Sequence, residues 1–273
     1  LHLCDRRQRQ MCIRDRIYKD KFFHTRRLKI MAFDTNRDTI VTRTGALEID
    51  EGLRQYMLKV YNYMTIGLLI TAGVSFFLAN SSLGAMFFSV ETGQPNLLGW
   101  IAILAPFVLI FMMGSAVSSG NASKAFTLFV VYSALFGISL TTIFWVYTGI
   151  SILRVFLITA GMFAGMSLYG YTTKRDLTKF GSFMMMGLIG IIIAMIVNIF
   201  LKSPALYLTV SVLGVVVFVG LTAWDTWKIR QIYNSGDSDN VVASKAIYGA
   251  LMLYMDFINL FLYLLRFFGD RRN

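Results

Sequence analysis

Seven apolar runs, each close to the length of a membrane-spanning helix, constrain this chain more than any other feature. They lie at about residues 57–79, 98–118, 124–147, 151–170, 181–201, 205–227 and 246–268. A helix needs about 20 residues to cross about 30 Å of hydrocarbon. A membrane β-barrel would instead show segments of about ten residues with alternating polarity, and residues 187–200 show no such alternation. The sequence therefore predicts an all-α polytopic membrane protein, a seven-transmembrane-helix bundle.

Composition excludes a soluble enzyme. Hydrophobic residues make up 56% of the 273, charged residues only 15%, and the mean hydropathy is +0.61. Both cysteines and both histidines lie within residues 1–30. The apolar runs therefore contain no thiol or imidazole for catalysis, haem ligation or a histidine proton relay. We expect no enzyme activity, no catalytic residue, no cofactor and no nucleic-acid partner.

The N-terminal segment divides into two parts. Residues 1–30 hold ten Lys or Arg and three Asp, which is +7 of the net charge of +11. They lack the apolar core and cleavage site of a secretory signal. The stretch MCIRDR resembles translated adapter sequence, so we interpret residues 1–30 as a non-native or disordered basic leader; a basic membrane-surface tail is the alternative. Residues 31–56 are then a cytoplasmic tail, and residues 57–273 the membrane domain.

The basic residues beside the runs indicate orientation. With a cytoplasmic N-terminus, eleven Lys or Arg lie inside and five outside. The inner set is Arg37, Arg43, Arg54, Lys59, Lys124, Lys174, Arg175, Lys179, Lys228, Arg230 and Lys245, and the outer set is Arg154, Lys202, Arg266, Arg271 and Arg272. The arginines of the C-terminal tail are unusual outside, which leaves two alternatives open, a re-entrant last segment or an unorthodox tail.

Two aspartates, Asp225 and Asp256, are the only charged side chains well inside the runs. Placing a carboxylate at membrane depth costs free energy on the order of 2.5 to 3.5 kcal/mol, so such a residue is expected to have a partner or a function. If one helix ends near Tyr233 and the next begins near Ala246, the two carboxylates lie at matching depths and face each other. They would then share a proton and act together as a pH sensor and ion gate.

Polar residues at helical spacing lie on the same face of each helix as its aspartate. Carboxylate oxygens are hard ligands, and they suit Ca²⁺ better than a soft metal. We predict that Ca²⁺ is the transported ion, that it gains access at Asp225 and Asp256, and that a polar path leads to them. The path residues are Thr222, Ser211, Asn259, Tyr263 and Asn198; Asn198 is equally well explained as an interhelical hydrogen bond.

Other interpretations of the aspartates stay open. Asp225 could lie near the membrane edge and pair with Lys228, and Asp256 could simply hydrogen-bond a neighbouring helix. A di-aspartyl intramembrane protease also has aspartates on adjacent helices, although in other sequence contexts. A retinal protein is excluded, because no run carries a lysine away from its ends. A non-transporting regulator of another membrane complex is the remaining alternative.

Small residues also recur at helical spacing in the fourth and fifth runs. We expect them to let these helices approach their neighbours closely. They are Gly161, Gly165, Gly187, Gly190 and Ala194. In addition, Ser203 followed by Pro204 predicts the first turn of the sixth helix.

Three stretches resemble the Bax inhibitor-1-like family, also called the transmembrane Bax inhibitor motif family, and in particular its bacterial inner-membrane branch. They are GMSLYGYTTKRDLTKFGSFMMMGLIG at 165–190, TAWDTWKI at 222–229 and ALMLYMDFINLFLYLLR at 250–266. The resemblance covers about residues 45–270.

The resemblance implies a seven-helix fold with the last helix central and a calcium leak controlled by pH through an aspartate pair. Asp225 and Asp256 match that pair by their position in the second and third stretches. Some members have an arginine in the second helix that contacts the pair, but residues 98–118 contain no basic residue. Other bacterial relatives are described as modulators of a membrane-bound protease, which supports the regulator alternative. The expected partners are the lipid bilayer, Ca²⁺, protons and, for the regulator, a membrane protease.

Overall fold

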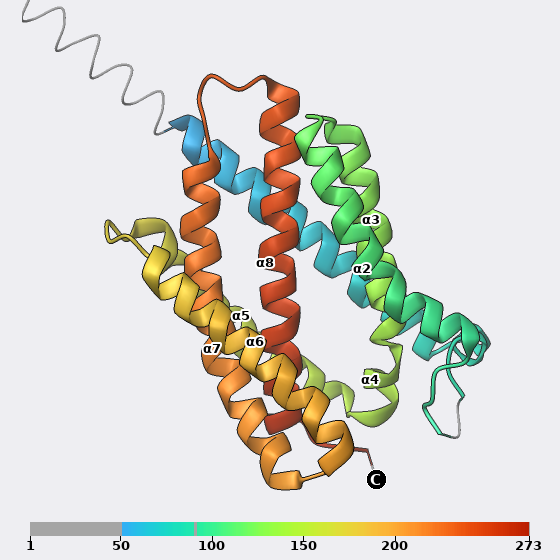
Figure 1. The fold of residues 1–273 in the computed structure, drawn as a ribbon. Helices are drawn as coiled ribbons and strands as arrows, with labels where there is room; N and C mark the ends of the chain where they lie inside the picture. The colour runs from blue at the N-terminus through green and yellow to red at the C-terminus, as the bar shows by residue number, and fades with distance from the viewer. Residues whose placement is uncertain (1–50, 90–91, 273) are drawn as a thin grey trace, which may run out of the picture. The chain divides into compact units, whose positions relative to one another are not determined.

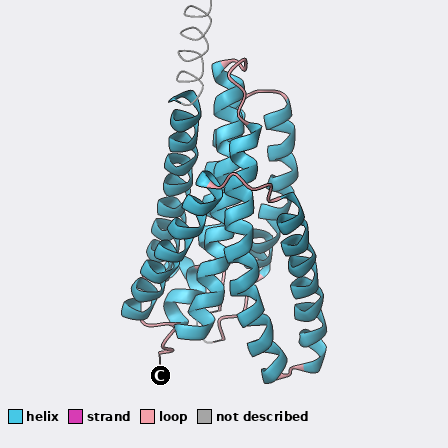
Figure 2. Cartoon of the chain, turned by 90° about the vertical axis from the view of Figure 1, so that its left-hand side faces the viewer, coloured by secondary structure: helices cyan, strands magenta, loops and turns pink. Residues whose placement is uncertain are grey.

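The computed structural model describes residues 51–89 and 92–272, which contain seven helices long and apolar enough to span a membrane (Figure 1). The first helix is Glu51–Ala79. It is followed by a short 3-10 helix, η1 (Ser82–Met86), and by α2 (Leu97–Ser118), α3 (Ala122–Ser139), α4 (Thr141–Val146), α5 (Gly149–Thr172), α6 (Thr178–Leu201), α7 (Pro204–Ile232) and α8 (Asp239–Phe268). Helices α3 and α4 together make the third span. Figure 2 shows helices and connecting loops, with no strand among the described residues.

The predicted fold is confirmed, and each apolar run falls on one span. The largest difference is the start of α8, which begins seven residues earlier than predicted. The predictions for residues 1–30 and 31–50 lie outside the described residues. Apart from the groups at their ends, helices satisfy their backbone hydrogen bonds within the segment, which is what a bilayer interior requires.

The helix ends follow local sequence signals. The Asn121 side chain caps α3 by accepting a hydrogen bond from the backbone N–H of Lys124 at 3.0 Å. At the start of α7, Ser203 accepts from the N–H of Leu206 at 3.4 Å, and Pro204 occupies the first turn. The prediction made from Ser203 and Pro204 is therefore confirmed.

Helix α8 is the centre of the bundle, as predicted (Figure 1). It contacts α2, α3, α5 and α7, and 67% of its membrane window is buried, against 44% or less for the other spans. It is one continuous helix that is long and apolar enough to cross a membrane, and the side on which the tail lies remains a prediction. The tail after α8 packs beside residues 146–148, at the opposite end of the bundle from the α7–α8 connection. We call these the C-terminal end and the α7–α8 end.

The antiparallel register of α7 and α8 can be followed through contacts. Lys245 Nζ donates to the Ile232 carbonyl at 3.3 Å, and a Cβ added at Gly249 would lie 3.0 Å from Ile229. Residues 239–244 therefore extend past the end of α7. This extension explains why the depth prediction, which started α8 near residue 246, places the aspartates correctly.

The prediction of close packing at the small residues of α5 and α6 is wrong for three glycines. A Cβ added at Gly161, Gly165 or Gly190 would have no other atom within 4 Å. All three are exposed on the outside of the bundle, where the surrounding lipid is the neighbour. Gly187 does have a near neighbour, the Val217 side chain at 3.0 Å, and Ala194 is partly buried against the core.

The close approaches occur at other glycines. A Cβ on Gly170 of α5 would meet the backbone carbonyl oxygen of Ala223, and one on Gly181 of α6 would meet the ring of Trp224. Both neighbours belong to α7, directly before Asp225. Glycine at these two positions therefore fixes how closely α5 and α6 pack on the aspartate-bearing part of α7.

Candidate functional site

The structure places the carboxyl groups of Asp225 and Asp256 next to each other across the α7–α8 interface. Asp225 is 8% exposed and Asp256 is 4% exposed. Their helices pack along most of their length, so the contact depends on the register described above. The predicted juxtaposition is present, and the sensor and gate roles remain predictions.

A hydrogen bond between two carboxyl groups requires a proton on one of them, because an ionised carboxylate has only acceptors. The outward oxygens of the pair, Asp225 Oδ1 and Asp256 Oδ2, are buried and have no hydrogen-bond partner. Buried polar atoms are rarely left in this state. The two oxygens can accept a hydrogen bond from a water molecule or contact a cation, and the shared proton remains a prediction.

Lys228 is the charged side chain that acts on the pair from its own helix. It interacts electrostatically with Asp225, but its Nζ lies 4.9 Å above the ring of Trp224 and forms no salt bridge with the carboxylate. The interpretation of Asp225 as a simple edge residue paired with Lys228 is therefore not what the structure shows, because the carboxyl group turns towards α8 instead.

The residues predicted to form a polar path mostly bond to their own helices. Thr222 and Ser211 donate to the carbonyls of the residues four positions earlier, both at 2.8 Å, and the Asn259 amide does the same at 2.8 Å. Tyr263 donates to the sulfur of Met195 at 3.6 Å. These side chains flank the α7–α8 interface without forming one connected chain to the aspartates.

Asn198 lies apart from the aspartate pair. Its side-chain oxygen accepts a hydrogen bond from the Ser203 N–H at 3.0 Å, and its carbonyl accepts from the Lys202 N–H at 2.8 Å. Lys202 has a positive φ of 46°, which the turn between α6 and α7 requires. Asn198 therefore stabilises this turn, whereas Asp225 lies about 33 Å of helix away from Ser203 at about 1.5 Å per residue.

A chain of hydroxyls that the sequence analysis missed links three spans beside Asp225. Tyr61 of the first helix bonds Ser167 of α5 at 2.7 Å, and Ser167 bonds Thr226 of α7 at 3.0 Å. The Thr226 hydroxyl donates its proton to the Thr222 carbonyl at 2.8 Å. The direction is therefore fixed, with Tyr61 donating to Ser167 and Ser167 to Thr226.

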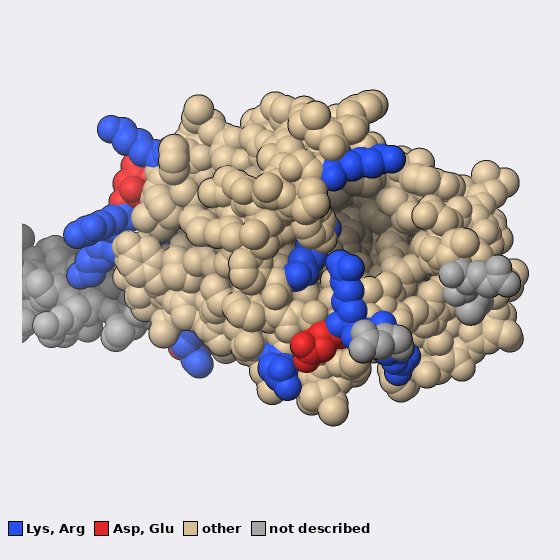
Figure 3. Space-filling view, turned by 90° about the horizontal axis from the view of Figure 1, so that it is seen from below, with Lys and Arg blue, Asp and Glu red and all other residues tan. Residues whose placement is uncertain are grey.

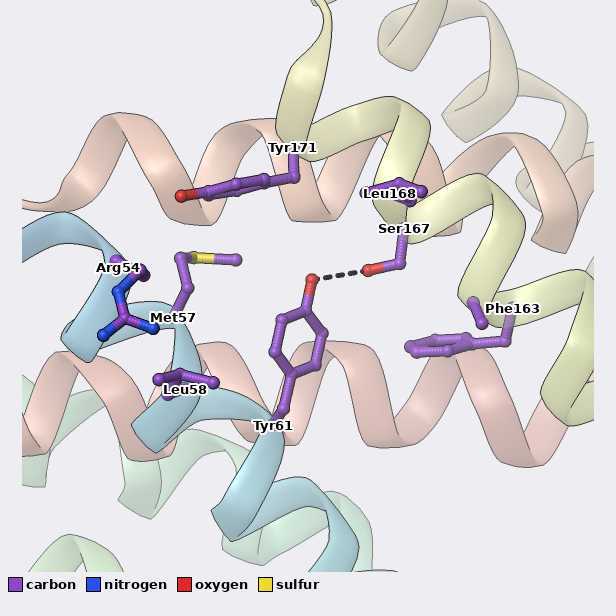
Figure 4. Close-up of a pocket in the computed structure, with 9 residues that line it drawn as sticks. Arg54, Met57, Leu58, Tyr61, Phe163, Ser167, Leu168 and Tyr171 are labelled. Atoms are coloured by element: carbon purple, nitrogen blue, oxygen red, sulfur yellow. Dashed lines mark hydrogen bonds between the residues drawn. The ribbon is translucent and has the colours of Figure 1, made fainter. Parts of the chain in front are cut away.

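This chain lies at the floor of a cavity of about 380 Å³ between the first helix and α5 (Figure 4). In Figure 4 the Tyr61 hydroxyl points at Ser167, while apolar side chains from both helices surround it. The lining residues are Arg54, Met57, Leu58, Tyr61, Phe163, Ala164, Ser167, Leu168 and Tyr171. The Ser167 hydroxyl lines the cavity and is bonded to Thr226, which is the residue after Asp225.

Replacing Tyr61 by Phe is expected to lower the free energy of unfolding by about 0.5 to 1.5 kcal/mol, the usual net value of one hydrogen bond. The Ser167 oxygen would lose its donor, while its own bond to Thr226 would remain. Thermal unfolding in detergent measures the change. Tyr169→Phe is the control, since Tyr169 is an exposed tyrosine of α5. Equal stability of Tyr61→Phe and the unaltered protein would contradict the assigned bond.

A second buried hydroxyl pair ties α8 to the first helix. Thr71 donates to the Ser133 carbonyl at 2.9 Å, so the Tyr254 hydroxyl donates to Thr71 at 2.7 Å. The Tyr254 ring also meets Phe129 edge-on, with 6.0 Å between ring centroids. Tyr254 lies two residues before Asp256, and these contacts hold that part of α8 in place.

The α7–α8 connection is closed by a half-buried ion pair. Lys245 lies 2.5 Å from Asp237, and the side chains are 25% and 19% exposed. A double-mutant cycle with Lys245→Gln and Asp237→Asn should give a coupling energy of about 1 kcal/mol, the upper end for exposed pairs, in unfolding measurements. Additive effects of the two substitutions would show that the pair contributes nothing to holding the connection.

Two carboxyl groups supply only part of the oxygen ligands that calcium takes. Calcium takes about six to eight oxygen ligands. Between residues 51 and 272, apart from 90 and 91, there is no group of three or more His, Cys, Asp or Glu side chains that could hold a metal. Any further oxygen ligands at the pair would come from hydroxyls, backbone carbonyls or water.

Comparison with known proteins gives consistent results. The family model described as "Inhibitor of apoptosis-promoting Bax1" matches residues 53–273. The chain is 48% identical to uncharacterized protein RP147 of Rickettsia prowazekii, over 86% of this chain and 98% of that protein. It is also 48% identical to inner membrane protein YbhL of Escherichia coli K12, over 81% of this chain and 94% of YbhL.

Proposed function

Because this chain belongs to the Bax inhibitor-1 family and is an integral membrane protein, we propose that it is a pH-sensitive calcium leak channel gated by Asp225 and Asp256. The observation that carries the proposal is that two buried carboxyl groups lie next to each other on neighbouring spans. The bacterial inner membrane is its location, by similarity to YbhL.

The gate works through the proton that the two carboxyl groups share. While the proton is present, the hydrogen bond joins α7 to α8 and the path is closed. When it leaves, two negative charges in contact repel each other by on the order of 4 kcal/mol at an effective dielectric constant of about 20. The helices then separate locally, and the freed oxygens attract Ca²⁺. Calcium flux should therefore rise with pH.

The surroundings of the pair support this use. Lys228 is the one other charge found to act on Asp225 within the described residues, and it lies on the same helix. Helix α2 packs against α8 and contains no basic residue that could hold the pair closed. The state of the shared proton alone sets the gate. The cavity between the first helix and α5, which we call the Tyr61 cavity, offers water and protons an approach to Asp225.

We place the N-terminus in the cytoplasm. The α7–α8 end of the bundle carries most of the described Lys and Arg, which is the pattern of cytoplasmic loops. Arg154, Lys202 and the arginines after α8 then lie outside. The aspartate pair lies in the cytoplasmic half of α7.

Calcium influx into dye-loaded proteoliposomes containing the purified protein, measured from about pH 6 to about pH 8, tests the proposal. We expect influx that increases with pH and exceeds that of protein-free liposomes. No influx above protein-free liposomes at any pH would contradict the channel function.

A second candidate function is that of a membrane regulator that transports nothing and binds another complex, such as a membrane protease. Helix α6 favours it, because only 11% of its membrane window is buried and it packs mainly on α7. An apolar helix so exposed can accept a partner helix. Specific co-purification of a membrane protease by a protein without flux would support this function.

A further inference from the structure

A second cavity, of about 500 Å³, lies at the C-terminal end of the bundle, away from the Tyr61 cavity. We call it the C-terminal cavity. It is lined by the first helix, α4, α5 and α8, and most of its surface is apolar. Its volume is within the range of about 300 to 1,000 Å³ typical of small-molecule sites. The apolar wall includes Phe76, Leu153, Phe156, Phe257 and Phe261.

The polar side chains of this wall are already satisfied by protein groups. Thr71 and Ser75 donate to the carbonyls of Ser133 at 2.9 Å and Gly137 at 2.7 Å. The Asn80 amide and the Trp145 indole donate to carbonyls of the first helix at 2.8 and 3.1 Å. Among the described residues, no Asp or Glu side chain lines this wall. The interior therefore suits an apolar chain.

Among the described residues, one charged group, Arg272, lines the cavity, and it is positive. The Arg272 N–H donates to the Val146 carbonyl at 2.8 Å, and the Thr148 N–H donates to the Asp270 carbonyl at 3.1 Å. These bonds hold the tail against α4 and α5. The exposed Arg272 guanidinium makes one long bond, 3.4 Å to the Phe144 carbonyl, so most of its donors face outward.

The charge around this opening is predominantly basic. The one acidic side chain of the tail, Asp270, is engaged by Arg154 at 3.6 Å. Arg266 lies over the rings of Tyr207 and Tyr263. In the view from below, basic side chains surround a hollow with one small acidic group among them (Figure 3). An anionic group is the natural complement of this rim.

The cavity opens sideways towards the lipid. Phe76 of the first helix and Leu153 of α5, which line it from two sides, are each 60% exposed. From Asn80 to Thr71 the wall descends nine residues, or about 13 Å at about 1.5 Å per residue. This depth is close to half of a hydrocarbon core of about 30 Å, the reach of one leaflet.

We propose that the C-terminal cavity binds an acyl chain of an anionic phospholipid from this leaflet, with the lipid phosphate on Arg272. The chain enters between the first helix and α5 and ends against Phe257 and Ile258, which follow Asp256 on α8. A bound chain thus supports the packing of the aspartate-bearing helix. The site does not depend on ion conduction.

Photolabelling tests the proposal directly. The full protein is reconstituted in phosphatidylcholine vesicles containing a trace of phosphatidylglycerol with a diazirine in one acyl chain, and the labelled peptides are mapped by mass spectrometry. We expect labels on the cavity-lining peptides of the first helix, α4, α5 and α8. A diazirine phosphatidylcholine should label them about fivefold less, as expected for one basic residue near an anionic headgroup.

Two pairs of variants make the result specific. Gly149→Phe fills the cavity from its wall, whereas Gly161→Phe adds the same ring on the same helix with open space around it and outside the cavity. Labelling should fall about fivefold or more in the first variant and stay unchanged in the second. Arg272→Gln should remove the preference for phosphatidylglycerol, and Arg271→Gln, which does not line the cavity, should keep it.

Three outcomes would overturn the proposal. The first is equal labelling by both lipids in the unaltered protein. The second is labelling of the cavity peptides that survives Gly149→Phe. The third is loss of the phosphatidylglycerol label when free palmitate is added in trace amounts, which would assign the cavity to a free fatty acid. Ion flux enters none of these measurements, so their failure would leave the proposed channel function untouched.

Discussion

Replacing Asp256 by Asn should leave calcium flux low and independent of pH. An amide carries no charge at any pH and can donate a hydrogen bond to Asp225, so α7 and α8 stay joined when the unaltered pair would repel. At the upper end of the range, near pH 8, we expect flux about tenfold or more below that of the unaltered protein, which corresponds to a gate free energy of at least about 1.4 kcal/mol. Proteoliposome influx across the pH range measures this.

Asp239→Asn is the matched control, because Asp239 is an exposed aspartate in the first turn of the same helix. Its flux should keep the unaltered pH profile. Asp225→Asn should flatten the profile in the same way as Asp256→Asn, and the double variant should add little, because the two groups act as one unit. A pH-dependent flux in Asp256→Asn would exclude the shared proton as the gate.

Replacing Gly170 by Val should destabilise the bundle more than any other single change proposed for this chain. A Cβ at this position would meet the backbone carbonyl oxygen of Ala223 on α7, and a helix backbone cannot move aside as a side chain can. Overpacking of this kind costs about 1 to 3 kcal/mol or more. We expect a clear fall in Tm, measured by thermal unfolding in detergent.

Gly161→Val provides the comparison, since it makes the same substitution on the same helix where no atom lies within 4 Å. Its Tm should remain close to that of the unaltered protein. If Gly170→Val and Gly161→Val lowered Tm equally, the loss would come from helix propensity in α5, and the close approach of α5 to α7 would not matter for stability.

The fold and the aspartate pair could be predicted from sequence because both follow from the cost of placing groups in lipid. A span must be about 20 apolar residues long, so the seven runs define the helices. Asp225 and Asp256 are the only charged residues deep inside a run. Each lies a similar number of residues from the α7–α8 connection, which predicts that they lie side by side. The same argument held although α8 begins at Asp239, because its additional turns extend past α7.

The interhelical hydroxyl bonds and the glycine contacts could not be predicted in the same way. Ser167 and Thr226 lie 59 positions apart, and nothing in either stretch shows that they meet. Gly161 and Gly170 look alike in sequence, yet one faces lipid and the other faces Ala223. Which side of a uniformly apolar helix faces the bundle depends on rotation about its axis, and an apolar run contains little information about that rotation.

The central claim is that Asp225 and Asp256 share one proton, and pH-difference infrared spectroscopy of the protein in lipid tests it most directly. The unaltered protein should show one buried carboxylic-acid carbonyl band that disappears as pH rises and carboxylate bands grow. The band should be absent from both Asp225→Asn and Asp256→Asn. A titrating carboxylic-acid band that persists unchanged in either single variant would show that the proton belongs to one residue alone, and would contradict the account.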